Sequence, residues 1–183
     1  MKKLLLTAYG FSTPWPKEKE KHPQMNQIKN DLIDMNMTKV DFLDVEFEDA
    51  NKLYDYDLIF LNGGYPFYLL HFLKKSGADR ILKEKFRSGS LIVGLSAGSI
   101  VMGRSINLMQ YLYPEDNRFN DVDLTGLNLT HLQIYPHFKE MLTRDATIKE
   151  KISEYENKTG VHITRLNNNQ AVKIDNDTLT FLG

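Results

Sequence analysis

One short segment of the chain combines a nucleophilic hydroxyl with small neighbours. Gly94-Leu95-Ser96-Ala97-Gly98 is a G-x-S-x-G sequence that lies between the apolar run Leu91–Gly94 and a helical pattern. In that context a sharp strand-to-helix turn exposes the serine hydroxyl, close to a helix N-terminus whose backbone N–H groups favour a developing anion. The same pentapeptide also fits an ordinary turn in which Ser96 caps the helix. The motif alone therefore leaves a nucleophile and a structural cap as alternatives.

Acyl transfer to a serine also needs an oxyanion site and a base. Asn62-Gly63-Gly64 follows the apolar run Asp57–Leu61, and a Gly-Gly turn there can present backbone N–H groups at a strand end, although it also fits a plain turn. His137 follows a short strand pattern and is the best candidate for the base among the histidines, although a lone histidine at such a position is more often structural. The other histidines fall in a charged loop, in a helix, at a strand start and beside the last helix: His22, His71, His131 and His162.

Composition excludes several other chemistries. The 183 residues contain no cysteine, which rules out disulfides, thiolate metal sites and a cysteine nucleophile. The net charge of −1 provides no global basic field for nucleic acid or an anionic membrane, and the lysines of Lys17–Lys21 alternate with glutamates. No H-E-x-x-H, P-loop or G-x-G-x-x-G motif is present, so we expect no metal and no organic cofactor.

The apolar runs are too short for targeting or membrane insertion. Leu4–Leu6 follows two lysines but is shorter than the apolar region of a signal peptide, and no run approaches the roughly 20 residues of a membrane span. We therefore expect a cytoplasmic protein that does not bind membranes. The length fits one domain, residues 1–183.

Strand-like and helix-like segments alternate along the chain, which predicts an α/β fold. The sandwich should have three layers, with helices on both faces of a mostly parallel central sheet in which Leu91–Gly94 is a central strand. Loops are expected at Phe11–Gln24 and, with helical fragments, at Ile106–Asn128. The remaining strands are predicted at Leu4–Ala8, Val40–Leu43, Asp57–Leu61, Leu132–Tyr135, His162–Leu166, Ala171–Ile174 and Thr178–Leu182, and the helices over Met25–Met35, from Pro66, over Asp79–Arg87, after Ser96 and over Lys139–Asn157.

Four segments, taken together, resemble the peptidase E family of serine peptidases, also known as aspartyl dipeptidases, whose fold is related to the class I glutamine amidotransferases. They are LIFLNGGYPFYLL, GADRILKEKFRSGSLIVGLSAGSIVM, LNLTHLQIYPHF and LNNNQAVKI, in the family's order. The resemblance implies a small peptide or amide substrate. It also implies roles for particular residues: Ser96 as nucleophile, His137 as base, Gly63, Gly64 and the N–H of Ala97 as oxyanion hole, and Arg144 near an acidic substrate side chain.

The chain departs from the family pattern at four places. Tyr65-Pro66 replaces the usual Asn-Thr after the Gly-Gly turn, and Tyr111 replaces an aspartate fifteen residues after the nucleophile. Asn168 stands where a carboxylate usually completes the triad, and the stretch between the first strand and Val40 is shortened. Asparagine can orient a histidine but stabilises an imidazolium less well than a carboxylate does.

These departures lead to two hypotheses. The first is a dipeptidase-like or amidase-like serine hydrolase with Ser96, His137 and Asn168 as catalytic residues and Tyr65, Tyr111 and Arg144 around the substrate. The alternative is a catalytically weak or silent protein that binds a ligand in the altered cleft. The sequence leaves open the substrate preference and whether the chain forms a homodimer.

Overall fold

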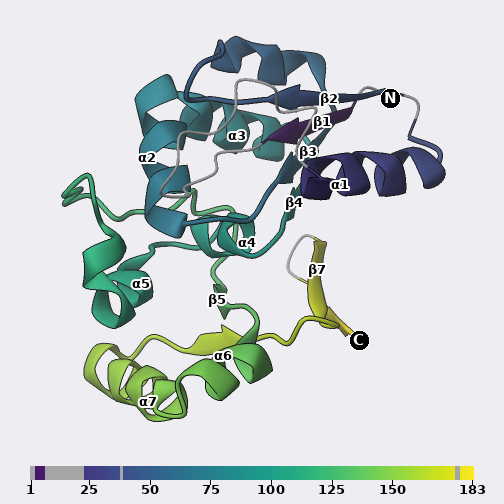
Figure 1. Ribbon diagram of the computed structural model, residues 1–183. Coiled ribbons are helices and arrows are strands. Elements are labelled where there is room, and N and C mark those ends of the chain that lie inside the picture. The colour runs from purple at the N-terminus through teal and green to yellow at the C-terminus, as the bar shows by residue number, and fades with distance from the viewer. Residues whose placement is uncertain (1–2, 7–22, 38, 176–177) are drawn as a thin grey trace.

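The computed structural model describes residues 3–6, 23–37, 39–175 and 178–183. It contains a four-stranded parallel sheet in the order β2-β1-β3-β4 (Figure 1). The strands are β1 (Lys3–Leu6), β2 (Val40–Leu43), β3 (Leu58–Leu61) and β4 (Leu91–Gly94). Leu61 lies opposite both Leu6 and Gly94 in the register. The carboxyl ends of the strands therefore meet at one edge of the sheet, where α/β proteins place their ligands.

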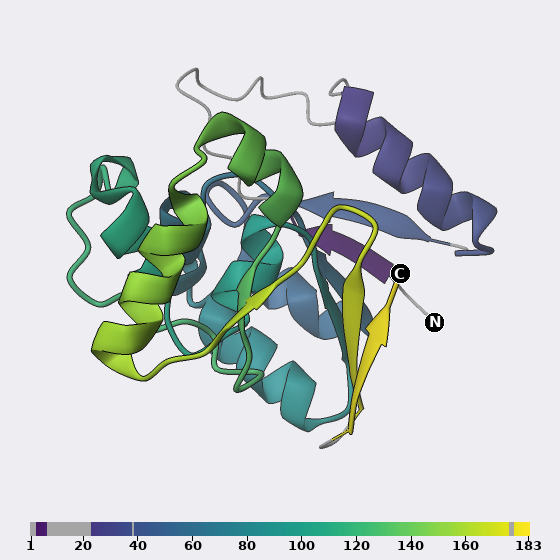
Figure 2. The ribbon, with the colours of Figure 1, turned by 90° about the horizontal axis from the view of Figure 1, so that it is seen from below.

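Helices cover both faces of this sheet. On one face, α1 (Pro23–Asp34) packs Ile28 and Leu32 around β2 and Phe60. On the other face lie α2 (Pro66–Ser76), α3 (Ala78–Arg87) and the 3-10 helix η2 (Ala50–Asp55), which share the main hydrophobic core with Ile59 and Leu61. Figure 2 shows α1 and the α2–α3 pair on opposite sides of the strands. The predicted three-layer α/β sandwich is confirmed.

The sequence of β3 explains this double covering. Successive side chains of a strand point to opposite faces, so Phe60 meets the α1 side while its neighbours Ile59 and Leu61 enter the main core. Pro66 begins α2, as predicted, because its missing N–H costs nothing at a first helical position. Four apolar residues of α2 are buried in the core: Leu69, Leu70, Phe72 and Leu73.

The prediction that Leu91–Gly94 is a central strand is wrong. Among the described residues, β4 is an edge strand of the four-stranded sheet, with β3 as its neighbour. Ile92 enters the main core, whereas Leu91 and Val93, which point to the other face, are 61% and 36% exposed. A central parallel strand is covered on both faces. The next predicted strand along the chain pairs elsewhere, which leaves β4 at the border.

The second half of the chain builds around a separate parallel pair. β5 (Gln133–Tyr135) pairs with β6 (Ile163–Arg165), and β7 (Ala171–Asp175) pairs with β8 (Thr178–Leu182) in an antiparallel hairpin. Between β4 and β5 lie α4 (Ala97–Val101), α5 (Asn107–Leu112) and the 3-10 helix η3 (Pro114–Asp116). The expected loop with helical fragments at Ile106–Asn128 is therefore confirmed.

The single helix predicted over Lys139–Asn157 is instead two helices, α6 (Phe138–Arg144) and α7 (Ile148–Thr159). Asp145 adopts an extended backbone conformation between them. Its carboxylate accepts hydrogen bonds from both the N–H and the hydroxyl of Thr147, at 2.9 and 2.6 Å. Such local side-chain bonds compete with helical backbone bonds and end α6.

The N-terminal predictions are tested only in part. Thr7 and Ala8 of the first predicted strand, and residues 11–22 of the first predicted loop, lie outside the described residues. α1 begins at Pro23, inside the stretch expected to be a loop. In the described part of the chain, no helix has the length and apolar character needed to cross a membrane.

Candidate active site

Ser96 lies at the junction of β4 and α4 in a strained backbone conformation. Its φ of 53° and ψ of −115° fall outside the regions that L-residues readily adopt. Strain of this kind costs free energy and persists only where the surrounding structure enforces it. Leu95 N donates to Leu61 O at 2.9 Å, which continues the sheet up to the turn. The side chain is half-buried, so the hydroxyl remains accessible.

The two glycines of the motif are required by close packing around this turn. A Cβ on Gly94 would lie 2.6 Å from Met102 Sδ and 2.7 Å from Ser99 N. A Cβ on Gly98 would overlap the carbonyl oxygen of Leu61. Any larger residue would push α4 away from β3, so the G-x-S-x-G spacing reflects how tightly the helix lies against the strand.

The Asn62-Gly63-Gly64 turn lies directly beside Ser96. A Cβ on Gly63 would be 3.1 Å from the Ser96 Cβ and 3.6 Å from its Oγ. Gly64 has a φ of 124°, which favours glycine. Within the described residues, the N–H groups of Gly63, Gly64 and Ala97 have no protein acceptor. Unpaired N–H donors next to a serine hydroxyl are what an oxyanion site requires.

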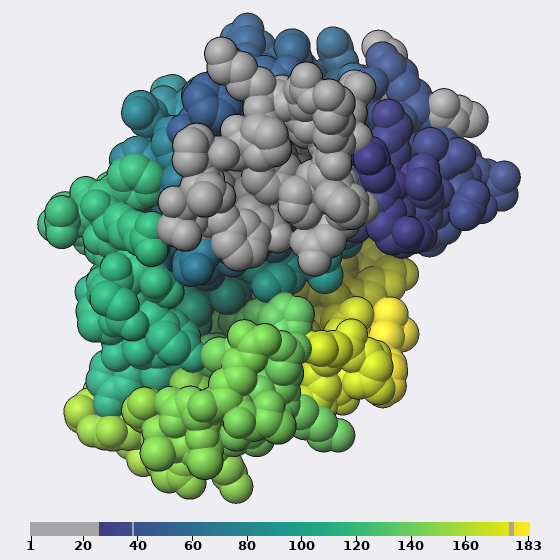
Figure 3. All heavy atoms as spheres, viewed as in Figure 1, coloured from purple at the N-terminus to yellow at the C-terminus, as the bar shows by residue number. Residues whose placement is uncertain are grey.

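His137 begins α6 with a left-handed backbone conformation, φ 58° and ψ 27°. Its Nδ1 lies 2.6 Å from Asn168 Oδ1, so the expected proximity of these two residues is confirmed. Two more hydrogen bonds join the segments: Phe138 N donates to Leu166 O at 2.9 Å and Lys139 N donates to Asn167 Oδ1 at 3.1 Å. In Figure 3 the green α6 and the yellow-green segment after β6 lie side by side on the surface.

The serine and the histidine do not form a hydrogen bond in this structure. Among the hydrogen bonds of the described residues, none joins the Ser96 hydroxyl to His137. The elements that carry them are neighbours, because α4 packs against β5 and β5 leads directly into α6 (Figure 1). Catalytic hydrogen bonds are often long or absent before substrate binds. The pairing of Ser96 with His137 therefore stays a prediction.

Arg144 has a partner within its own helix. Its guanidinium forms an ion pair with Glu140, one turn earlier in α6, and its side chain is 68% exposed. Glu140 also accepts a hydrogen bond from Asn168 Nδ2 at 3.2 Å. This hydrogen bond, followed by the positive charge of Arg144, holds the pKa of Glu140 below its usual value. The expected contact of Arg144 with a substrate carboxylate stays a prediction.

Sequence reasoning missed Glu140, although it lies three residues after His137 and touches Asn168. The available signal was its position four residues before Arg144, a spacing that favours an ion pair on a helix. That spacing alone could not reveal the contact with Asn168, which lies 28 residues further along the chain.

The two predicted tyrosines lie in different surroundings. Tyr65 follows Gly64 and is the N-terminal cap of α2, so it borders the Gly-Gly turn. Tyr111 lies on α5, where its ring centre is 5.5 Å from that of Tyr155 on α7 and 5.5 Å from Lys158 Nζ. Tyr111 therefore packs against α7, and its expected role in substrate binding stays a prediction.

The described residues contain no group of three or more histidine, aspartate or glutamate side chains placed to hold a metal ion. The described residues provide a strained, half-buried serine, three backbone N–H groups beside it with no acceptor among these residues, and a histidine hydrogen-bonded to an amide. These are the kinds of group that nucleophilic attack on a carbonyl group requires.

Comparison with known proteins gives consistent matches. The sequence profile of Peptidase family S51 matches residues 17–182. An uncharacterized peptidase of Listeria monocytogenes is 30% identical over 127 residues, which are 69% of this chain and 60% of that protein. A peptidase E of Shewanella sp. strain ANA-3 is 36% identical over 87 residues, 46% of this chain and 34% of that protein. The matched segments thus span less than two thirds of these relatives.

Two solved structures share the fold. A Listeria monocytogenes protein assigned to peptidase E superposes with a TM-score of 0.76 and 23% identity, covering 98% of this chain and 84% of that one. A peptidase from an acI-B1 Actinobacterium superposes with a TM-score of 0.67 and 18% identity, covering 100% of this chain and 74% of that one. At these identities the likeness establishes the fold.

Proposed function

Because this chain belongs to peptidase family S51, we propose that it is a serine-type hydrolase that cleaves small peptides, such as dipeptides, by acyl transfer through Ser96. The observation that carries the proposal is the strained Ser96 turn with Gly63 packed against the serine side chain. A plain helix cap needs neither the strain nor the neighbouring free N–H groups.

In the reaction, Ser96 Oγ attacks the carbonyl carbon of the scissile bond while His137 takes the hydroxyl proton on Nε2. The tetrahedral intermediate collapses, the C–N bond breaks, and His137 returns the proton to the leaving amine. Water then attacks the acyl-enzyme with His137 again as base, which releases the acid and restores the Ser96 hydroxyl. The step requires the His137 ring to come within hydrogen-bond distance of Ser96 when substrate binds.

The N–H groups of Gly63, Gly64 and Ala97 would stabilise the negative oxygen of the intermediate. Donors aimed at a developing oxyanion are typically worth about 10²–10³-fold in rate each. They come from two turns at the carboxyl ends of adjacent strands, β3 and β4, whose pairing fixes their separation. This rigidity supports a preorganised site.

Two observations favour the second hypothesis, a weakly catalytic or silent ligand-binding protein. Within the described residues the Ser96 hydroxyl makes no hydrogen bond to His137, and the third member of the predicted triad is an amide instead of a carboxylate. A ligand held by the three N–H groups would use the same cleft without turnover.

A fluorophosphonate probe separates the two functions. We expect a covalent adduct on Ser96, located by tandem mass spectrometry, and no adduct in a Ser96→Ala variant. Ser99, whose hydroxyl donates to Ser96 O at 2.6 Å, is an internal control that should remain unlabelled. Dipeptides with N-terminal Asp, Glu or neutral residues then define the substrate range. A folded protein that is neither labelled nor hydrolytic would favour the ligand-binding function.

A further inference from the structure

We propose that Glu140 is a positioning residue that determines which nitrogen of His137 carries the proton, acting through the amide of Asn168. The inference rests on the proposed function only for its catalytic consequence. Its structural basis is a continuous row of contacts: Arg144 to Glu140, Glu140 to Asn168, and Asn168 to His137.

The direction of each hydrogen bond follows from the chemistry of the groups. An ionised carboxylate only accepts hydrogen bonds, and an amide side chain has one donor end and one acceptor end. Because Glu140 Oε2 lies 3.2 Å from Asn168, the amide must turn its NH₂ group toward Glu140. Its Oδ1 then faces His137 Nδ1 at 2.6 Å. Since Oδ1 only accepts, Nδ1 must carry the proton.

This tautomer is the one that catalysis by His137 requires. A neutral imidazole protonated on Nδ1 has its free electron pair on Nε2, which can then accept the proton of the Ser96 hydroxyl. With the Asn168 amide turned over, NH₂ would face Nδ1 and the proton would move to Nε2. In that state His137 could not act as base.

An aspartate at position 168 would not need such help, because both of its oxygens accept. Asparagine needs this help, because one end of its amide donates and the other accepts. The contact between Asn168 and His137 is exposed to solvent, so packing does not select one of the two amide orientations. Arg144 keeps Glu140 in place and ionised, which is consistent with the lowered pKa of this carboxyl group. Glu140 thus supplies the orientation that the substitution of a carboxylate by Asn168 would otherwise lose.

NMR of the ¹⁵N-labelled full chain tests the tautomer directly and needs no turnover. In the wild type we expect the ring signals of His137 to show a protonated Nδ1 at neutral pH. Glu140→Gln retains shape but can present either a donor or an acceptor to Asn168, so a mixture of tautomers should result. Glu154→Gln is the matched control, because Glu154 forms an exposed i,i+4 ion pair with Lys158 on α7, whereas the carboxylate that accepts from Asn168 among the described residues is that of Glu140. Wild-type ring signals in Glu140→Gln would overturn the proposal.

A double variant distinguishes orientation from general structural damage. With Asn168 present, Glu140→Gln should lower kcat at least about tenfold and leave KM nearly unchanged. The upper limit is the loss of about 10⁴-fold in kcat that follows when a catalytic histidine is held in the wrong tautomer. In an Asn168→Asp background the same substitution should cost nothing, because an ionised carboxylate at this position cannot present a donor to His137. Equal losses in both backgrounds would refute the proposal.

In the Asn168→Asp background, Glu140→Gln should even raise the activity. Asn168→Asp alone places a second carboxylate about where Asn168 Nδ2 now meets Glu140 at 3.2 Å, and the two charges repel. Glu140→Gln removes that repulsion, so the double variant should be the most active of the four proteins. A tautomer change in Glu140→Gln without hydrolysis by any variant would support the positioning role and contradict the proposed function.

Discussion

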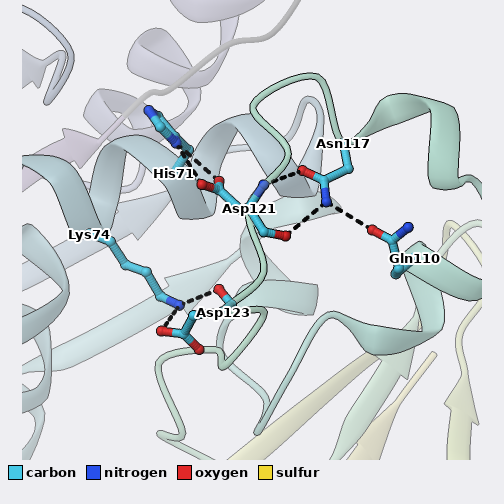
Figure 4. A network of polar contacts seen from close by, with 6 residues as sticks. All are labelled: His71, Lys74, Gln110, Asn117, Asp121 and Asp123. Carbon is cyan, nitrogen blue, oxygen red and sulfur yellow. Dashed lines mark hydrogen bonds and ion pairs between the residues drawn. The ribbon is translucent and has the colours of Figure 1, made fainter.

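Two histidines of this protein differ in the kind of side-chain oxygen that lies beside the ring. His71, on α2, places Nδ1 3.0 Å from the carboxylate of Asp121 (Figure 4). Its ring also stacks on that of Phe119, with 3.8 Å between the ring centres. Among the described residues, the side-chain oxygen that meets His137 is the amide oxygen of Asn168, in a solvent-exposed contact. By the His–carboxylate contact alone, His71 would be the better catalytic base.

The surroundings reverse that conclusion. Phe72 also meets the His71 ring edge-on, and Asp121 is fixed by hydrogen bonds to Asn117, whose amide bonds to Gln110 as well. This network holds the segment after η3 against α2 (Figure 4). A histidine–carboxylate pair can therefore be purely structural, so this contact alone does not identify a catalytic base.

The largest expected effect is the loss of activity when His137 is replaced. His137→Ala should lower kcat/KM by about 10²–10⁴-fold, the usual contribution of a general acid–base group. His131→Ala, an exposed histidine just before β5, is the control and should retain activity. Steady-state kinetics on the preferred dipeptide measures both. Full activity in a folded His137→Ala variant would exclude His137 as the base.

His71→Ala should act on stability instead. Loss of the ring from between two aromatic neighbours, together with an unpaired Asp121, should lower the free energy of unfolding by about 1–3 kcal/mol. Urea unfolding measures it. His162→Ala is the matched control, because the His162 ring also lies near a carboxylate, that of Glu156 at 3.4 Å, but is 83% exposed. The free energy of unfolding of this variant should stay within about 0.5 kcal/mol of the wild-type value. A large loss of kcat in a folded His71→Ala variant would contradict the structural role of His71.

Arg144→Ala tests whether Arg144 also determines the preference for an acidic substrate side chain. Because the Arg144 guanidinium is engaged by Glu140, we expect kcat/KM for Asp-X and neutral dipeptides to fall by similar factors, about fivefold or less, as for loss of an exposed ion pair. The ratio of the two kcat/KM values is the measurement. A strong Asp-X preference that disappears in Arg144→Ala would show that Arg144 binds the substrate carboxylate.

The smallest effect should come from the exposed part of the His71 region. Lys74 Nζ lies 2.8 Å from an Asp123 carboxylate oxygen, and this hydrogen bond, with those from Thr125, holds the pKa of Asp123 well below its usual value. Asp123→Asn should cost about 0.2–1 kcal/mol at neutral pH, because the pair is solvated. The folded pKa is depressed, so the contribution is complete above the unfolded pKa of about 3.9 and is lost as pH falls through the folded value. Urea unfolding at pH 7 and pH 2.5 should show the difference between the proteins shrink on acidification; a constant difference would contradict it.

Local patterns predicted the elements well. The apolar run of β3, Pro66 at the start of α2 and the glycines flanking Ser96 each act within a few residues, so their sequence signals are direct. Asp145 was also a local signal, since an aspartate side chain can bind nearby backbone N–H groups in competition with a helix, and it accounts for the split that the longer helical pattern concealed.

Long-range features could not be read in the same way. The place of β4 at the sheet border depends on β5 pairing with β6, and alternation within Leu91–Gly94 does not specify a neighbour. The position of Asn168 beside His137 followed from the family resemblance, whereas Glu140 became visible only when the segment after β6 was seen to fold against α6.

The packing of Gly94 and Gly98 bears on how relatives of this chain can diverge. Both glycines are demanded by the approach of α4 to β3 and neither supplies a reacting group, so a relative that loses Ser96 would still have to keep them. Position 96 is constrained differently, because its φ of 53° and ψ of −115° lie outside the left-handed helical region that asparagine and aspartate tolerate, and glycine adopts such a conformation with the least strain. Relatives that lose the serine should therefore show G-x-G-x-G at the elbow, and the identity of the middle residue alone would separate them from relatives that keep the nucleophile.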